Sequence, residues 1–185
     1  MCVIAGIVYS ISSPCVCILD DNNPLTWDNC LWYYNQKGHK QHETNFPAFN
    51  SDRFFNDKDI RLYTLADWAL SIIVEHNAEA VALEGYAMGA CGRVFDIAEA
   101  TGLLKSYLRK AGIPLYIFAP TFNKKSFSGK GNANKEKMID TFNQKNKINI
   151  AESMGYKPDY FGSPISDIVD SYSLIDTFLK ERTKL

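Results

Sequence analysis

Residues 80–114 constrain the fold more than any other part of the sequence. They begin with a short apolar run at residues 80–83, which has the length and composition of a buried strand. Glu84 and Gly85 follow at once, and after a small-residue turn an amphipathic pattern with a period near 3.6 predicts a long helix that ends at Gly112. A charge at the end of a buried strand is unusual. Two interpretations are open: Glu84 simply points into water, or it belongs to a site.

The other hydrophobic patterns predict an α/β domain with a mixed five-stranded sheet. Near the N-terminus, turn-forming residues separate three apolar runs, which is typical of an antiparallel meander, at residues 2–9, 15–19 and 31–34. A clear helical pattern at residues 62–77 comes before the central strand, and a further short strand is expected at residues 115–118. Strands that first form a meander and then alternate with helices predict a layered domain in which helices flank the sheet.

The length of the chain predicts a single domain. The 185 residues can bury a sizeable core, so we expect residues 1–185 to form one domain. Residues 36–61 are polar, show no clear period and are long for a structureless loop, so we interpret them as an insertion. The insertion either packs over the core or reaches a ligand as a mobile arm. It contains four phenylalanines, Phe46, Phe49, Phe54 and Phe55.

The five cysteines indicate a reducing compartment. Their number is odd, no two are spaced as in a Cys-x-x-Cys motif, and the extended backbone makes a bridge between Cys15 and Cys17 difficult, so we expect free thiols. The N-terminal apolar run has no basic region before it, and no stretch reaches the length of a membrane span. These observations favour a cytoplasmic protein, in a bacterial cytosol or a virus-infected cell, over a secreted or membrane protein.

Residues 120–147 form the most basic part of a chain whose net charge is only −1. The segment has seven lysines and two acids, which gives it a net charge of +5. Its glycine-rich part, residues 128–135, lets the backbone come close to a partner, and the lysines suit an anion such as phosphate. A helix is expected at residues 134–145. The alternative interpretation is a solvated basic face without a partner.

Two further acids open the last predicted helix. The pattern at residues 167–179 indicates a helix with Ser166 as its cap, and Asp167 and Asp170 share one face of its first turn. Acids at this position are also explained by the helix dipole, which favours negative charge near an N-terminus.

Together these features resemble the RuvC family of Holliday junction resolvases, which belongs to the RNase H-like superfamily. The resemblance covers most of the chain in order, outside residues 36–61 and the C-terminal tail. It rests on the Gly-Ile-x-Tyr-Ser turn at residues 6–10, Glu84-Gly85, the helix from Gly92-Arg93-Val94-Phe95 to Gly102-Leu103-Leu104, Ala111-Gly112-Ile113-Pro114, Pro120 with Lys124-Lys125, Gly129-x-Gly131-x-Ala133-x-Lys135, and Asp167-x-x-Asp170.

The resemblance implies a structure-selective endonuclease that cuts Holliday junctions or other branched DNA as a homodimer. In such a site four carboxylates bind two Mg²⁺ ions, which Mn²⁺ can replace, and the ions hydrolyse a phosphodiester bond. Glu84, Asp167 and Asp170 correspond to three of these catalytic and metal-binding acids. The residues that correspond to DNA-backbone contacts are Lys124, Lys125, Lys130, Asn132 and Lys135.

Val8 is the one important departure from the family pattern. The first-strand acid of the family belongs at this position, although a valine suits a buried strand well. Val8 is explained either by a natural variant or by an engineered inactive form, and the otherwise complete set of acids favours the engineered form. In both cases we expect weak metal binding, little or no cleavage, and DNA binding that survives.

Three other functions are compatible with the sequence. A non-catalytic junction-binding protein would explain Val8, an RNase H-type nuclease would act on RNA–DNA hybrids, and a protein-interaction module would leave the basic segment without a role. Gly102 has two interpretations as well, because it permits close packing either against a second copy or within the monomer.

Overall fold

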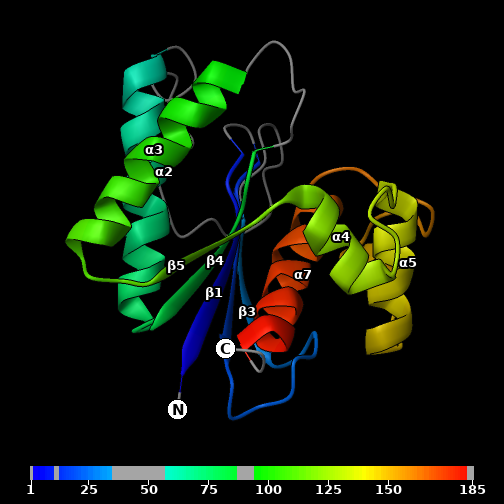
Figure 1. Cartoon of the computed structure of the whole chain (residues 1–185). Coiled ribbons are helices and arrows are strands. Elements are labelled where there is room, and N and C mark those ends of the chain that lie inside the picture. The colour runs from blue at the N-terminus through cyan, green and yellow to red at the C-terminus, as the bar shows by residue number, and fades with distance from the viewer. Residues whose placement is uncertain (1, 11–12, 35–56, 87–93, 183–185) are drawn as a thin grey trace.

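The computed structural model describes residues 2–10, 13–34, 57–86 and 94–182 of the chain (Figure 1). Its centre is a five-stranded sheet with the order β3-β2-β1-β4-β5. Neighbouring strands are antiparallel from β3 to β1 and parallel from β1 to β5. The strands are β1 (Val3–Val8), β2 (Cys15–Asp20), β3 (Cys30–Tyr34), β4 (Ala80–Glu84) and β5 (Leu115–Phe118). The predicted mixed sheet, with a meander followed by β/α units, is therefore confirmed.

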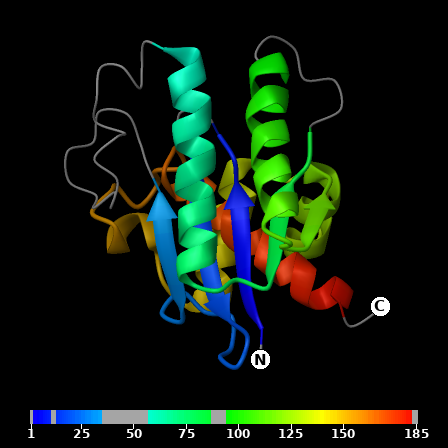
Figure 2. The same cartoon turned by 90° about the vertical axis from the view of Figure 1, so that its left-hand side faces the viewer.

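Helices α2 (Lys58–Glu75) and α3 (Val94–Lys110) cover one face of the sheet. Figure 2 shows them side by side in front of the strands. Alternate strand residues such as Ile7 and Leu83 point into this layer and form a buried core with α2 and α3. At the surface, Lys58 of α2 makes ion pairs with Asp96 and Glu99 of α3.

Helix α7 (Ile165–Arg182) covers the opposite face, and α4 (Pro120–Ser128) and α5 (Lys135–Asn146) pack on its outer side (Figure 1). A single turn, α6 (Ile150–Ser153), follows α5. The strand residues of the opposite parity, including Ile4, Val8 and Ala82, belong to the core beneath α7. The two faces of the sheet thus pack against different helices.

Gly6 allows α7 to approach β1 closely. A Cβ atom at this position would collide with the backbone carbonyl oxygen of Ser171 and would lie 2.8 Å from the Ile175 side chain. Any larger residue would therefore push α7 away from the sheet. This approach sets the height of the first turns of α7 above the ends of β1 and β4.

Several predicted boundaries differ from the structure. Helix α2 begins at Lys58, capped by the Asp57 side chain, so the last residues assigned to the insertion are helical. Helix α7 begins at Ile165, so Ser166 lies inside the helix and the prediction that it is the cap was wrong. Helix α4 was not predicted because it is polar and buries only Asn123 and Phe127. The four phenylalanines of the insertion lie outside the described residues.

The cysteine prediction is confirmed for the four cysteines that the structure describes. Cys2, Cys15, Cys17 and Cys30 are all free, and the last three are buried. Among the described helices, none combines the length and the apolar character that crossing a bilayer would require.

We expect the Gly6→Ala variant to lower the free energy of unfolding by about 1–3 kcal/mol, because the added methyl group overpacks the β1–α7 contact. Urea denaturation measures the change. The matched control is Gly102→Ala in α3, where an added Cβ meets nothing within 4 Å. The control should raise stability by up to about 1 kcal/mol, since alanine is the better helix former. Equal stability of Gly6→Ala and the parent chain would contradict the close approach.

Candidate carboxylate site

Glu84 lies at the end of β4, on the face of the sheet that α7 covers. It has the same parity along the strand as Ala80 and Ala82, both of which belong to the core beneath α7. β4 pairs with β5 as far as Glu84 and Phe118. The Gly85 N–H then donates a last hydrogen bond to the Phe118 carbonyl at 2.8 Å. The carboxylate is thus only half-exposed, and burial raises its pKa.

Asp167 lies in the first turn of α7. Its Oδ2 atom is buried and has no hydrogen-bond partner within the described part of the chain. Burial raises the pKa of this carboxyl, whereas the hydroxyls of Ser163 and Ser13 and the charge of Lys135 lower it. A buried carboxylate oxygen without a partner is costly in a folded protein, so this atom is available to a ligand.

Asp170 is the most strongly affected acid of the site. Burial, followed by the charges of Glu84 and Asp167, raises its pKa from an ordinary value of 3.8 to about 7, although Lys124 and Lys135 act in the opposite direction. Electrostatic effects of this kind weaken with distance. The acids predicted at the end of β4 and at the start of α7 therefore share one site.

Val8 lies at the end of β1, on the same face of the sheet as Glu84. Its side chain is 8% exposed and belongs to the core beneath α7. β1 is the parallel neighbour of β4, so the two side chains come from adjacent strand ends. The position is therefore adjacent to the carboxylates, and valine supplies no ligand there.

The predicted DNA-binding residues fall into two groups. Lys124 of α4 and Lys135 of α5 lie near the acids, as shown by their effects on the Asp170 pKa, and Lys135 Nζ donates a hydrogen bond to Ser166 Oγ at 3.2 Å. The other three residues are exposed on α4 and in the turn that follows it: Lys125, Lys130 and Asn132. The first group balances the charge of the carboxylates, and the second presents hydrogen-bond donors to solvent.

The turn between α4 and α5 holds these residues close to the helices. Gly129 ends α4 with a φ of 82°, which favours glycine. A Cβ atom at Gly131 would lie 3.1 Å from the Thr121 carbonyl oxygen, so this position also favours glycine. Asn134 then caps α5, because its side chain accepts a hydrogen bond from the Lys137 N–H at 2.9 Å. The glycines of this segment thus serve a compact helix–turn–helix connection.

The donor set suits a hard divalent cation in its chemistry but is incomplete in number. Carboxylate oxygens are the ligands that Mg²⁺ prefers. Asp167 Oδ2 is buried without a hydrogen-bond partner among the described residues, and the charges of Glu84 and Asp167 add to burial in raising the pKa of Asp170. However, among the described residues no group of three or more His, Cys, Asp or Glu side chains is placed to hold a metal ion. Glu84, Asp167 and Asp170 bring carboxylate oxygens to this end of the sheet, and the neighbouring Val8 brings none.

Sequence reasoning missed the polar residues that surround the acids. Ser13 comes from the β1–β2 connection and Ser163 from the segment before α7, and their hydroxyl oxygens lie 3.4 Å apart. Asn123 is buried in α4. No feature of the sequence connects the two serines with the acids, and no periodic signal marks α4. Only the three-dimensional structure brings them to the site.

We expect Asp170→Asn to stabilise the protein at pH 8 in EDTA. The raised pKa means that the folded chain keeps a proton that the unfolded chain releases between pH 3.8 and about 7, so stability is lost over this range and the penalty persists above it. Each pKa unit corresponds to about 1.4 kcal/mol, so the gain is at most about 4 kcal/mol. Urea denaturation at several pH values should show the gain declining toward pH 4.

The control is Asp176→Asn on the same helix. Asp176 makes ion pairs with Lys145 at 2.8 Å and Lys180 at 2.5 Å, so its removal should lower stability or leave it unchanged. A destabilising effect of Asp170→Asn at pH 8 would show that the acids do not repel one another.

No family model matches this chain. Among solved structures, it is similar to Thermus thermophilus RuvC, with 17% identity, a TM-score of 0.59, and 98% and 97% of the two chains covered. T. thermophilus RuvC in complex with a Holliday junction substrate is 18% identical, with a TM-score of 0.62, and the match covers 99% of this chain and 98% of that chain. The yeast mitochondrial Holliday junction resolvase Ydc2 is 14% identical, with a TM-score of 0.64, and the match covers 98% of this chain and 79% of that chain. The chain therefore has the fold of RuvC and other Holliday junction resolvases.

Proposed function

We propose that this chain is a junction-resolving endonuclease of the RuvC type, and that Val8 leaves it able to bind branched DNA but impaired in cleavage. The observation that supports the proposal is that Glu84 of β4 and Asp167 of α7 both raise the pKa of Asp170 by their charge. The fold also supports it, since T. thermophilus RuvC and fowlpox virus resolvase were both solved with Holliday junction DNA.

In this proposal the three carboxylates hold Mg²⁺ or Mn²⁺, and an acid at position 8 would complete the set for two ions. Bound divalent cations supply a more acidic water and neutralise charge at the scissile phosphate. In the cation-free protein, Asp170 holds a proton on a carboxylate oxygen up to about neutral pH, and cation binding requires its release. Lys124 and Lys135 reduce the repulsion between the carboxylates and an approaching phosphate.

The exposed residues of the basic segment would hold the DNA backbone beside the site. Lys125, Lys130 and Asn132 are exposed on α4 and the α4–α5 turn, and both elements lie on the α7 side of the sheet. Contacts of this type position the duplex without reading its sequence. In this role the glycines would keep the turn compact, and the exposed side chains would make the phosphate contacts.

A homodimer would let two sites cut two strands symmetrically. Helix α3 supports this arrangement, because Phe95 and Ile97 are 78% and 38% exposed and nothing lies within 4 Å of an added Cβ at Gly102. Exposed apolar side chains on one helix suit contact with a second copy.

The proposal predicts that Val8→Asp restores cleavage. Both the chain and the revertant should bind a labelled four-way junction, and only the revertant should cut it with Mg²⁺, because the added carboxylate completes the ligand set. We expect a gain of at least about 100-fold in the cleavage rate. The matched control is Val8→Asn, which has nearly the same shape as the aspartate variant but no charge.

The outcomes separate the candidate functions. Binding by both proteins with cleavage by neither would favour a non-catalytic junction-binding protein, the alternative that Val8 itself supports. Preferential cutting of an RNA–DNA hybrid by the revertant would favour an RNase H-type nuclease. Failure of both proteins to bind DNA would favour a protein-interaction module.

The proposal also predicts that Lys125→Gln and Lys130→Gln weaken junction binding in a salt-dependent way. Each lost phosphate contact should reduce the slope of log K against log salt by about 1 and lower the affinity about equally for all sequences. Titrations at 50–200 mM salt, chosen as roughly the range over which such effects are large, measure this. Lys110→Gln on α3, across the sheet, is the control and should leave the slope unchanged. If Lys125→Gln and Lys130→Gln leave the slope unchanged, as the control does, the basic segment does not contact the DNA backbone.

A further inference from the structure

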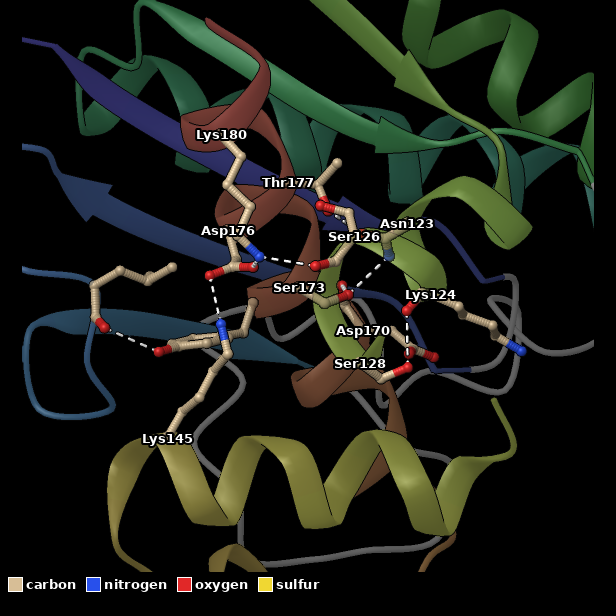
Figure 3. Close-up of polar contacts among 12 residues, drawn as sticks. Asn123, Lys124, Ser126, Ser128, Lys145, Asp170, Ser173, Asp176, Thr177 and Lys180 are labelled. Carbon is tan, nitrogen blue, oxygen red and sulfur yellow. Dashed lines mark hydrogen bonds and ion pairs between the residues drawn. The ribbon is translucent and has the colours of Figure 1, made fainter. Parts of the chain in front are cut away.

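A buried chain of hydrogen bonds connects α4 to α7 (Figure 3). Thr177 Oγ1 donates to Asn123 Oδ1 at 2.8 Å, and Asn123 Nδ2 donates to Ser173 Oγ at 2.7 Å. Ser173 Oγ in turn donates to the backbone carbonyl of Asp170 at 2.7 Å. Asn123 is 1% exposed, and Ser173 and Thr177 are fully buried. This series of hydrogen bonds therefore begins at Thr177 in the interior of α7 and ends at the backbone carbonyl of Asp170, an acid of the carboxylate site.

The direction of the hydrogen bonds fixes the geometry of the contact. Ser173 uses its one hydroxyl proton on the Asp170 carbonyl, so it must accept from the Asn123 NH₂ group. This orients the amide so that its oxygen accepts from the Thr177 hydroxyl. Ser173 and Thr177 are four residues apart and lie one turn apart on the same face of α7. A single amide therefore spans one turn of α7, and α4 cannot slide along α7 without leaving a buried polar group unpaired, which is costly.

A second contact holds α4 nearer its C-terminal end. Lys180 Nζ of α7 donates to the Ser126 carbonyl at 2.8 Å and also pairs with Asp176, which binds Lys145 of α5 (Figure 3). These groups are largely at the surface, where ion pairs contribute little. Phe127 of α4 also packs against Tyr172 of α7, but apolar packing is not directional. The buried amide is therefore the directional contact that specifies the register of α4 on α7.

Lys124 is the residue that this register controls. It follows Asn123 directly, and its side chain and that of Asp170 extend to the same side of the α4–α7 contact in Figure 3. Helix α4 begins just after β5, whose last residue, Phe118, pairs with Glu84. The N-terminal turns of α4 therefore lie beside the strand end that carries Glu84. A shift of α4 by a fraction of a turn would move the Lys124 ammonium away from both acids.

We propose that Asn123 is a positioning residue: its buried amide locks α4 on α7 so that Lys124 faces Asp170 and Glu84. The consequence for cleavage rests on the function proposed above, but the lock itself does not. An apolar side chain of similar size would fill the same volume without specifying the register.

A double-mutant cycle tests the lock without any enzymatic activity. In EDTA at pH 8, urea denaturation is measured for Lys124→Met, Thr177→Val, and the double variant. Lys124→Met should lower the folding equilibrium constant several-fold, because the acids lose a neighbouring positive charge. In the Thr177→Val background this effect should shrink by at least about 3-fold, since the ammonium is no longer held in place. Valine keeps the shape of threonine, so this variant should fold. Additive effects would overturn the proposal.

Two further variants complete the cycle. Asn123→Leu removes the whole lock and should reduce the Lys124→Met effect at least as much as Thr177→Val does. Lys180→Met is the matched control, because it removes the α4–α7 hydrogen bond at Ser126 but leaves the buried hydrogen bonds of Asn123 intact. The Lys124→Met effect should be unchanged in this background, and an equal reduction there would reduce the role of Asn123 to ordinary helix packing.

A second experiment uses the Val8→Asp revertant and a four-way junction. Asn123→Leu should lower kcat by about 10-fold with little change in KM, and it should cause no further loss when Lys124 is already methionine. Coupling in the denaturation cycle together with an inactive revertant would leave the lock standing and remove the proposed function. Cleavage by the revertant with independent losses from Asn123→Leu and Lys124→Met would keep the function and overturn the positioning role.

Discussion

The close packing of α7 on β1 is the contact on which the rest of this structure depends. Gly6 removes the side chain that would collide with the Ser171 carbonyl, so the helix lies directly on the central strand. β4 is the parallel neighbour of β1, and its last residue, Glu84, therefore lies beneath the first turns of the same helix. The carboxylates are half-buried and repel one another because the helix is so close. One steric condition thus produces both the core and the electrostatic character of the site.

The basic segment has a second role that follows from this repulsion. Lys124 and Lys135 act on the carboxylates from α4 and α5, both of which pack on the outer side of α7. Charges that lower the pKa of a buried acid stabilise its ionised form. The lysines near the acids therefore help the fold to tolerate them, and the exposed lysines of the same segment remain free for an anionic partner. The two groups differ in whether their charge acts on the acids rather than in residue type.

The sheet and the acids could be predicted from the sequence because each has a local signal. Apolar runs of strand length gave the mixed sheet, and the charge after residues 80–83 marked Glu84. Helix α4 could not be predicted in this way, since its buried residues include Asn123, which no hydrophobic pattern detects. Ser13 and Ser163 are 150 positions apart in the chain and meet only because α7 returns to β1. Local periodicity predicts elements, whereas contacts of this kind depend on the packing between them.

Val8 fits the fold as an apolar core residue beside the carboxylates. Its side chain lies in the core beneath α7, where an apolar residue is favourable and an ionised one would have to be balanced. An acid at this position would add a further negative charge beside Glu84, Asp167 and Asp170, so a valine makes these three acids less costly to bury. Their burial still raises the Asp170 pKa to about 7, and Asp167 Oδ2 still lacks a partner in the described structure. Packing alone does not account for acids held in this state, and this is the physical argument for the cation site proposed above.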